Sequence, residues 1–144
     1  MKINEAGIEL IKHFEGCRLT AYKCPAGIWT CGWGHTGDVA QGQVLTQHQA
    51  DVILESDLEK FEEGVTELTS KLTLNENQFS ALVSLAYNIG MTRFASSTLY
   101  KKLMKGDLEG AAAEFPKWTL AAGQKLQGLV DRRAAELALF LKPC

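Results

Sequence analysis

Apolar side chains recur every three or four positions at the start of the chain, which is the spacing of one face of a helix. The pattern predicts a helix over residues 4–15, with Asn4 as its N-cap and Gly16 as the left-handed residue that ends it. The apolar face consists of Ile3, Gly7, Leu10, Ile11 and Phe14. Glu15 is therefore expected in the last turn of this helix.

The next segment changes to alternating apolar and polar positions, which is the period of a strand. Residues 18–22 and 27–33 predict two short strands, connected by a turn in which Pro25 fixes φ and Gly27 closes the turn. Residues 37–44 are rich in glycine and polar side chains and predict a loop. We therefore expect a small β-hairpin followed by a loop.

A helical period returns after this loop. Thr46 followed by Gln49 is a capping-box pattern, and it predicts a long helix that runs to about residue 69. The apolar stripe of this helix is narrow and its far side is charged, which is typical of a helix that partly bridges two lobes. The stripe consists of Leu54, Leu58, Phe61, Val65 and Leu68.

The remaining chain predicts helices with short connections. Residues 75–90 are apolar nearly all round, which predicts a central buried helix that ends at Gly90. Pro116 interrupts the helical pattern, and a small element is expected to begin at Trp118. The other predictions are helices at about 97–105, at about 107–115 with Asp107 as cap and at about 129–141, and a loop at 121–128. The fold class is therefore expected to be α+β.

Composition excludes several classes of protein. The 144 residues suffice for one domain with a hydrophobic core, and 46% apolar with 22% charged residues is ordinary for a globular protein. A net charge of −2 with mixed signs gives no basic face for nucleic acid. No run of 18 apolar residues predicts a membrane span, and Glu5 and Glu9 interrupt any signal-like stretch. The possibility that an N-terminal export segment was removed stays open.

The cysteines allow several kinds of chemistry. They are Cys17, Cys24, Cys31 and Cys144. Without an export signal, free thiols are favoured, but a Cys17–Cys24 disulfide across the strand and turn stays open. The seven-residue spacings lack the short chelating pair of structural zinc sites, even with His13 or His35 as further ligands. We therefore expect no metal.

Glu15 is the candidate general acid. The helix-end carbonyls and the neighbouring apolar strands both disfavour its ionised form, and a general acid has to carry a proton near neutral pH. Taken alone, an exposed glutamate before a glycine cap is the commoner situation. Thr30 is a residue type that favours strands, so its presence in one is ordinary. Gly32 and Gly34 predict a close approach of the backbone to a strand or a ligand.

The order Glu15, Cys24, Thr30, followed by GWGHT, resembles the phage-type lysozymes (endolysins) of glycoside hydrolase family 24. Later segments also resemble that family: LTQHQADVILESDL, LNENQFSALVSLAYNIG, FASSTLYKKL, LEGAAAEFPKW and GLVDRRAAELALF. The resemblance implies one lysozyme domain over residues 1–144. Its two lobes would be residues 15–60 with the hairpin, and the helical residues 61–144 packed with helix 4–14.

The resemblance also implies hydrolysis of the β-1,4 bond between N-acetylmuramic acid and N-acetylglucosamine in peptidoglycan. Glu15 would be the general acid, and Cys24 and Thr30 would position the attacking water. Cys24 stands where many members have Asp, so the second carboxylate of most glycosidases is missing. Our hypothesis is inversion at the anomeric carbon, because a thiol and a hydroxyl can orient water without forming a sugar adduct.

Further positions are carried over from the same resemblance. They are Tyr87, Asn88, Gly90, Thr98 and Arg132 for substrate binding, and His35 for a structural polar contact. The extra serine in FASSTL leaves Ser97 open beside Thr98. A different loop length leaves Arg133 open beside Arg132.

Two other functions remain open at this stage: a lytic transglycosylase acting on the same bond, and a module that binds peptidoglycan without cutting it. A reversible Cys17–Cys24 disulfide that blocks the site is a further hypothesis. The resemblance implies no cofactor, a monomer, and peptidoglycan glycan strands as partner. It also implies synthesis in the host cytoplasm, with access to the wall after a holin or another agent breaches the membrane.

Overall fold

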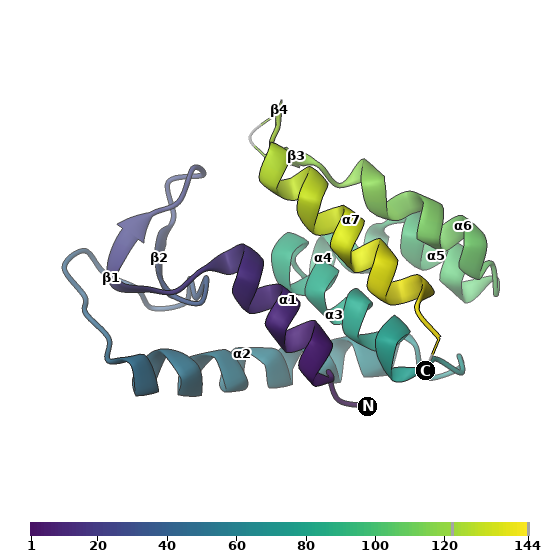
Figure 1. The fold of residues 1–144 in the computed structure, drawn as a ribbon, viewed down its shortest axis with the longest axis horizontal. Helices are drawn as coiled ribbons and strands as arrows, with labels where there is room; N and C mark the ends of the chain where they lie inside the picture. Colours follow the sequence, from purple (N-terminus) through teal and green to yellow (C-terminus); the bar gives the residue numbers. More distant parts are fainter. Residues whose placement is uncertain (122, 144) are drawn as a thin grey trace.

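A β-hairpin and a group of helices lie at opposite sides of the molecule, with one long helix running beneath both (Figure 1). This computed structural model describes residues 1–121 and 123–143, and its fold is α+β, as predicted. The helices are α1 (Glu5–Glu15), α2 (Gln47–Leu68), α3 (Glu76–Ile89), α4 (Met91–Ser96), α5 (Thr98–Met104), α6 (Leu108–Glu114), the 3₁₀ turn η1 (Phe115–Lys117) and α7 (Gln127–Leu141). The strands are β1 (Arg18–Lys23), β2 (Trp29–Gly32), β3 (Leu120–Ala121) and β4 (Gln124–Lys125).

Local capping defines α1 as the sequence predicts. The Asn4 side chain accepts a hydrogen bond from the Gly7 backbone, and Gly16 follows the last turn with φ of 67°. Gly7 also lets α1 approach α3 closely, because a Cβ atom there would lie 2.8 Å from the Cβ of Ser80. The helix therefore ends in a fixed place, with Glu15 as its final residue.

The hairpin also forms where it was predicted. β1 and β2 are antiparallel, with Tyr22 opposite Thr30 and Lys23 opposite Trp29. The Gly27 backbone N–H donates to the Cys24 carbonyl at 2.8 Å, which closes the turn that Pro25 begins. This register carries the turn residues and Thr30 to the same end of the hairpin.

The long helix α2 contributes to two hydrophobic clusters. Its capping box forms, with Thr46 and Gln49 bonded to each other's backbone. Ala50 packs in the small cluster beneath the hairpin, together with Cys31 and Leu45. The later apolar residues of α2 belong to the main core; they are Leu54, Leu58 and Val65. Because α2 crosses residue 60 without a break, the division into lobes at that point stays a prediction.

Helix α3 is the centre of the molecule, as its apolar sequence predicts. It packs against α1, α2, α4 and α7 (Figure 1). Eight consecutive residues, from 79 to 86, are buried on all sides of it. Helices α1 and α7 therefore both pack against α3, which fixes their positions relative to each other.

Three features differ from the predictions. Residues 91–96 form α4, which was not predicted; it begins directly after Gly90 without a side-chain cap and is too short to show a period. The predicted loop 121–128 contains β4, and the last residue of β3 opens it. Helix α7 begins at Gln127 rather than at 129, since its first two residues, Gln127 and Gly128, are exposed and carry no apolar side chain. Within the described residues, no helix is long and apolar enough to cross a membrane.

Candidate active site

Glu15 is held from two sides at the end of α1. Arg132 of α7 donates from Nη1 to Glu15 Oε2 at 2.7 Å, and the two side chains are 3% and 18% exposed. On the other side lies Gly34, where an added Cβ atom would collide with Glu15 Oε1. Gly34 also has φ of 83°, a conformation that other residues rarely adopt. The close approach predicted for Gly34 is therefore made by the carboxylate of Glu15.

Arg132, and not Arg133, contacts Glu15. The two residues are neighbours on α7, but the guanidinium of Arg133 points elsewhere, with Nη2 2.8 Å from Asn88 Oδ1. Arg132 is further fixed by its Nη2, which donates to the Ser84 carbonyl at 3.2 Å. The choice between the two arginines, which the sequence left open, is thus decided by how α7 packs on α3.

Cys24 and Thr30 share one end of the hairpin. Thr30 is 3% exposed, and its hydroxyl lies 3.0 Å from the Ile28 carbonyl oxygen, to which it can donate. Desolvation raises the pKa of the Cys24 thiol, but hydrogen bonds with the backbone at Ile28 and Ala26 and with the Thr30 hydroxyl outweigh it. The pKa of Cys24 therefore lies below its ordinary value, which favours the nucleophilic thiolate.

Tyr22 is a site neighbour that the sequence analysis did not single out. It faces Thr30 across the hairpin, and it lies two positions before Cys24, so the period of a strand places these side chains on one face. Burial raises the pKa of the Tyr22 phenol, and the charge of Glu15 raises it further, while the guanidinium of Arg18 opposes both. The phenol therefore lies within electrostatic range of Glu15. The two-residue period around Cys24 was the signal that could have found it.

The predicted residues of α3 have partners within the protein. Tyr87 donates from its hydroxyl to the Trp33 carbonyl at 2.7 Å, which ties α3 to the segment after the hairpin. Asn88 receives the hydrogen bond from Arg133 at Oδ1. Gly90, with φ of 92°, ends α3 and begins α4, so it shapes the backbone at this position.

Ser97 and Thr98 differ in how far their side chains are buried. Ser97 is buried, and its Oγ caps α5 by accepting from the Tyr100 backbone at 3.0 Å. Thr98 is exposed at the first position of α5. Of the two, only Thr98 presents its side chain to solvent, while the Ser97 hydroxyl is used within the fold.

Two carboxylates of α2 hold the segment after β2. His35 Nδ1 lies 2.6 Å from Asp57 Oδ2, which makes the kind of structural polar contact expected of this histidine. Trp33 donates from Nε1 to Asp51 Oδ1 at 2.8 Å. Trp33 also packs against both hydrophobic clusters. Gly34, between Trp33 and His35, is therefore anchored on each side.

The hairpin excludes the Cys17–Cys24 disulfide, and with it the proposed redox block. Strand β1 lies between the two residues, so their Cα atoms are roughly 20 Å apart, whereas a disulfide needs about 4.4–6.8 Å. Cys17, Cys24 and Cys31 are free thiols, and Cys144 lies outside the described residues. The described residues contain no group of three or more His, Cys, Asp or Glu side chains suited to a metal ion.

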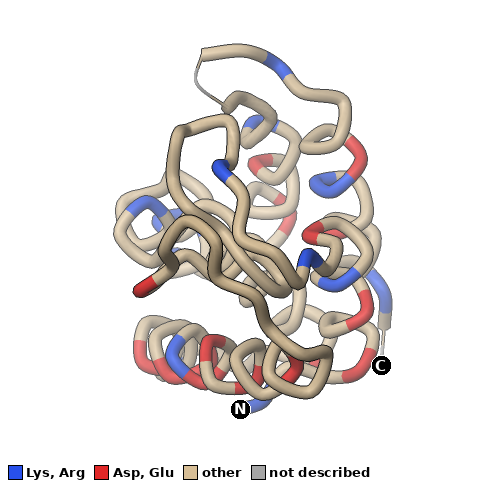
Figure 2. The backbone as a smooth tube through the Cα atoms, turned by 90° about the vertical axis from the view of Figure 1, so that its left-hand side faces the viewer, with Lys and Arg blue, Asp and Glu red and all other residues tan. Residues whose placement is uncertain are grey.

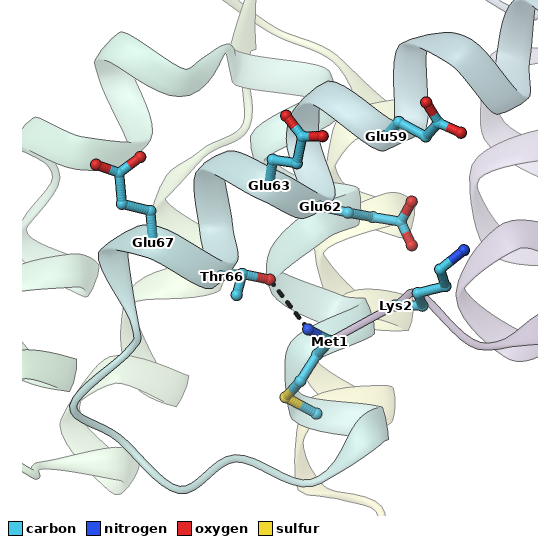
Figure 3. A pocket seen from close by; sticks show the side chains of 7 residues that line it. All are labelled: Met1, Lys2, Glu59, Glu62, Glu63, Thr66 and Glu67. Carbon is cyan, nitrogen blue, oxygen red and sulfur yellow. Dashed lines mark hydrogen bonds between the residues drawn. The ribbon is translucent and has the colours of Figure 1, made fainter.

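An acidic groove of about 580 Å³ lies at the opposite end of α1 from Glu15 (Figure 3). It is lined by Met1, Lys2, Glu59, Glu62, Glu63, Thr66 and Glu67. Several of its polar groups are already bonded: the Met1 nitrogen donates to Thr66 Oγ1, and Glu62 accepts from the Ile3 backbone. The groove lies between the N-terminal residues and α2, whose acidic positions are red in Figure 2, and it contains none of the predicted site residues.

The arrangement is suited to acid–base chemistry. A carboxyl group at a helix end is held by one guanidinium, and a hairpin carries a hydroxyl and a thiol of lowered pKa. Tyr22 connects the two parts electrostatically, since its phenol responds to the charges of both Glu15 and Cys24. These groups can donate a proton and orient a water molecule.

The comparisons with known sequences agree on one family. The family described as phage lysozyme matches residues 12–136. The endolysin of Acyrthosiphon pisum secondary endosymbiont phage 1 is 50% identical, covering 97% of this chain and 98% of its own length. The endolysin of Bacillus phage PZA is 48% identical over 97% of this chain, which spans 55% of that relative.

A solved structure shows the same fold. The muramidase domain of SpmX from Asticaccaulis excentricus superposes with a TM-score of 0.89 and 41% sequence identity, and it covers 99% of each chain. The match therefore includes both the hairpin and the helices that hold the candidate site.

Proposed function

This chain belongs to the phage lysozyme family and is a lysozyme-type glycoside hydrolase, and we propose that it cleaves the β-1,4 bond between N-acetylmuramic acid and N-acetylglucosamine, with Glu15 as general acid. The observation that carries the proposal is the position of Glu15, at a helix end between Arg132 and Gly34. The names of the relatives, endolysin and muramidase, support peptidoglycan as the substrate.

The two oxygens of Glu15 have different tasks. Oε2 accepts the hydrogen bond from Arg132, which favours negative charge on that oxygen. Oε1, beside Gly34, is then the oxygen that carries the proton and delivers it to the leaving sugar. Arg132 stabilises the carboxylate that remains after the transfer, so it assists the step without taking part in the proton transfer.

Cys24 and Thr30 hold the attacking water in this proposal. The single proton of the Thr30 hydroxyl goes to the Ile28 carbonyl or to the Cys24 thiolate, so its lone pairs accept a hydrogen from water. The lowered pKa of Cys24 lets the thiolate accept the second hydrogen. Water held in this way attacks the anomeric carbon from the face opposite the leaving group and passes a proton to the Cys24 thiolate, which predicts inversion.

The helical side is proposed to bind the glycan strand. Arg133 bonds Oδ1 of Asn88, which leaves the N–H donors at Nδ2 for a sugar oxygen. Thr98, Gly90 and Tyr87 are proposed to extend this side: the Thr98 side chain is exposed, and the Tyr87 hydroxyl is held by the Trp33 carbonyl.

Purified protein tested on peptidoglycan and on permeabilised bacterial cells distinguishes the possible functions. We expect clearing by the wild type and none by Glu15→Gln. Binding without clearing would identify a binding module. Muropeptides one water lighter would identify a lytic transglycosylase. Proton NMR of fresh product showing the retained β-anomer would refute inversion.

In its biological setting the protein is proposed to act as a monomer that degrades the wall and releases phage progeny. We propose synthesis in the host cytoplasm, followed by access to the wall once a holin or a similar agent breaches the membrane. Sedimentation of the purified chain tests the monomer, and expression with and without a holin tests the requirement for a breach.

A further inference from the structure

We propose that Glu136 is a positioning residue for the reaction, because this one buried carboxylate holds both the arginine that binds Glu15 and the arginine that binds Asn88. The inference rests on the proposed function, in which Glu15 donates the proton and Asn88 binds sugar. It adds a residue that makes no contact with substrate and acts through two others.

The helix α7 brings the three charges together. Arg132 and Arg133 lie four and three positions before Glu136, so both guanidiniums can reach the same carboxylate one turn later. Arg132 Nε lies 3.3 Å from Oε2, and Arg133 Nε lies 2.7 Å from Oε1. Arg133 also donates from Nη2 to Oε2 at 3.2 Å, so both guanidiniums contact the one carboxylate.

The facing helix α3 completes the arrangement. Ser84 donates from Oγ to Glu136 Oε2 at 2.6 Å, and its carbonyl accepts from Arg132 Nη2. Asn88 lies one helical turn after Ser84 and accepts from Arg133. The cluster thus contains two carboxylates and two guanidiniums, with Glu136 at the centre and Glu15 and Asn88 at its two outer ends.

Burial makes this arrangement costly unless it serves a purpose. Glu136 is fully buried, and Arg132 and Arg133 are 3% and 1% exposed. Apolar residues of similar volume often stabilise a protein as well as a buried ion cluster does, so stability alone gives a weak reason for it. Fixing two guanidiniums in direction is a property that apolar residues lack.

Glu136 also orients the guanidinium that reaches Glu15. Arg132 contacts Glu136 through Nε and Glu15 through Nη1, so one planar group joins the two carboxyl groups. If Glu136 becomes neutral, Arg132 loses the charged partner that orients it, and its contact with Glu15 becomes less well fixed.

The test compares two buried carboxylates. In Glu136→Gln we expect kcat on glycan chains at neutral pH to fall by about 10- to 100-fold. The control is Glu114→Gln on α6, which is also buried but pairs with Lys102 and Lys117. The control should keep its activity within about twofold.

A second variant tests the contact between Arg133 and Asn88, and it does not depend on whether Glu136→Gln folds. Arg133→Lys keeps a positive charge beside Glu136 but cannot bridge to Asn88 with a rigid fork. We expect KM to rise about fivefold, the effect of one lost hydrogen bond, while kcat stays within about twofold.

The outcomes separate this inference from the function on which it rests. A wild type that does not cleave glycan overturns the proposed function. An active wild type with a folded Glu136→Gln that retains its kcat overturns the positioning role. If Glu136→Gln does not fold, an unchanged KM in Arg133→Lys overturns it instead.

Discussion

The hydroxyl of Tyr87 donates to the backbone carbonyl of Trp33 at 2.7 Å, and this bond fixes the segment that carries Gly34 against the central helix. Trp33 is held a second time by its indole, which donates to Asp51 on α2. Gly34 consequently stays next to the carboxylate of Glu15. The acid is therefore positioned by contacts from α7, α3 and α2, while it belongs to α1.

Replacement of Gly34 by Ala should strongly reduce activity. The variant forces a side chain into a φ of 83°, at a cost of about 1–2 kcal/mol, and its Cβ collides with Glu15 Oε1. The control is Gly42→Ala, at φ of 85° with open space around it. We expect both variants to lose similar stability in thermal melts, but only Gly34→Ala to lose about 100-fold in clearing rate. Equal activity in the two variants would contradict the contact.

The thiol of Cys24 should react faster than an ordinary cysteine near neutral pH. Because its pKa is lowered, Cys24 carries more thiolate than a free cysteine at the same pH, and the midpoint of its alkylation against pH should lie below that of free cysteine measured in parallel. A variant in which Ser replaces both Cys17 and Cys144 isolates the signal, since Cys31 is buried. The rate is measured with iodoacetamide and mass spectrometry. A midpoint at or above that of free cysteine contradicts the prediction.

Stability should fall in alkaline solution because of Tyr87. Burial raises the pKa of its phenol, and the charges of Glu15 and Asp57 raise it further. The folded state thus keeps a proton that the unfolded state loses above about pH 10, and the unfolding free energy decreases by up to about 1.4 kcal/mol per pH unit. Below pH 10 this contribution is fully present.

The variant Tyr87→Phe tests this pH dependence. It should be about 1 kcal/mol less stable at pH 7, through loss of the bond to Trp33, but its stability should decline less steeply above pH 10. Urea unfolding at a series of pH values measures both effects. Parallel curves for the variant and the wild type would assign the alkaline loss to other groups.

Two adjacent substitutions should separate folding from binding. Ser97→Ala removes the cap of α5 and should cost about 1 kcal/mol of stability with kcat/KM unchanged. Thr98→Ala removes an exposed hydroxyl and should change stability by less than about 0.5 kcal/mol while raising KM. Chemical unfolding and steady-state kinetics check the pair. A raised KM in Ser97→Ala alone would reverse the assignment.

The sequence predicted those parts of the fold that depend on neighbours along the chain. The caps at Asn4, Thr46 and Asp107 form as predicted, since each bond joins residues three positions apart. Helix α4 was missed because a six-residue helix without a side-chain cap has neither a period nor an N-terminal signal. The pairing of β3 with β4 was missed because each strand has only two residues.

The sequence by itself therefore determined the fold class, the hairpin, and the position of Glu15 at the end of α1. Only the tertiary structure decided that Arg132 rather than Arg133 binds Glu15, that Gly34 makes room for the carboxylate, and that Glu136 joins the two arginines. The physical reason is the separation along the chain of the residues that interact. Caps and turns are hydrogen bonds within a few residues, whereas Arg132 and Glu15 are 117 residues apart and meet because α1 and α7 pack on the same helix, α3.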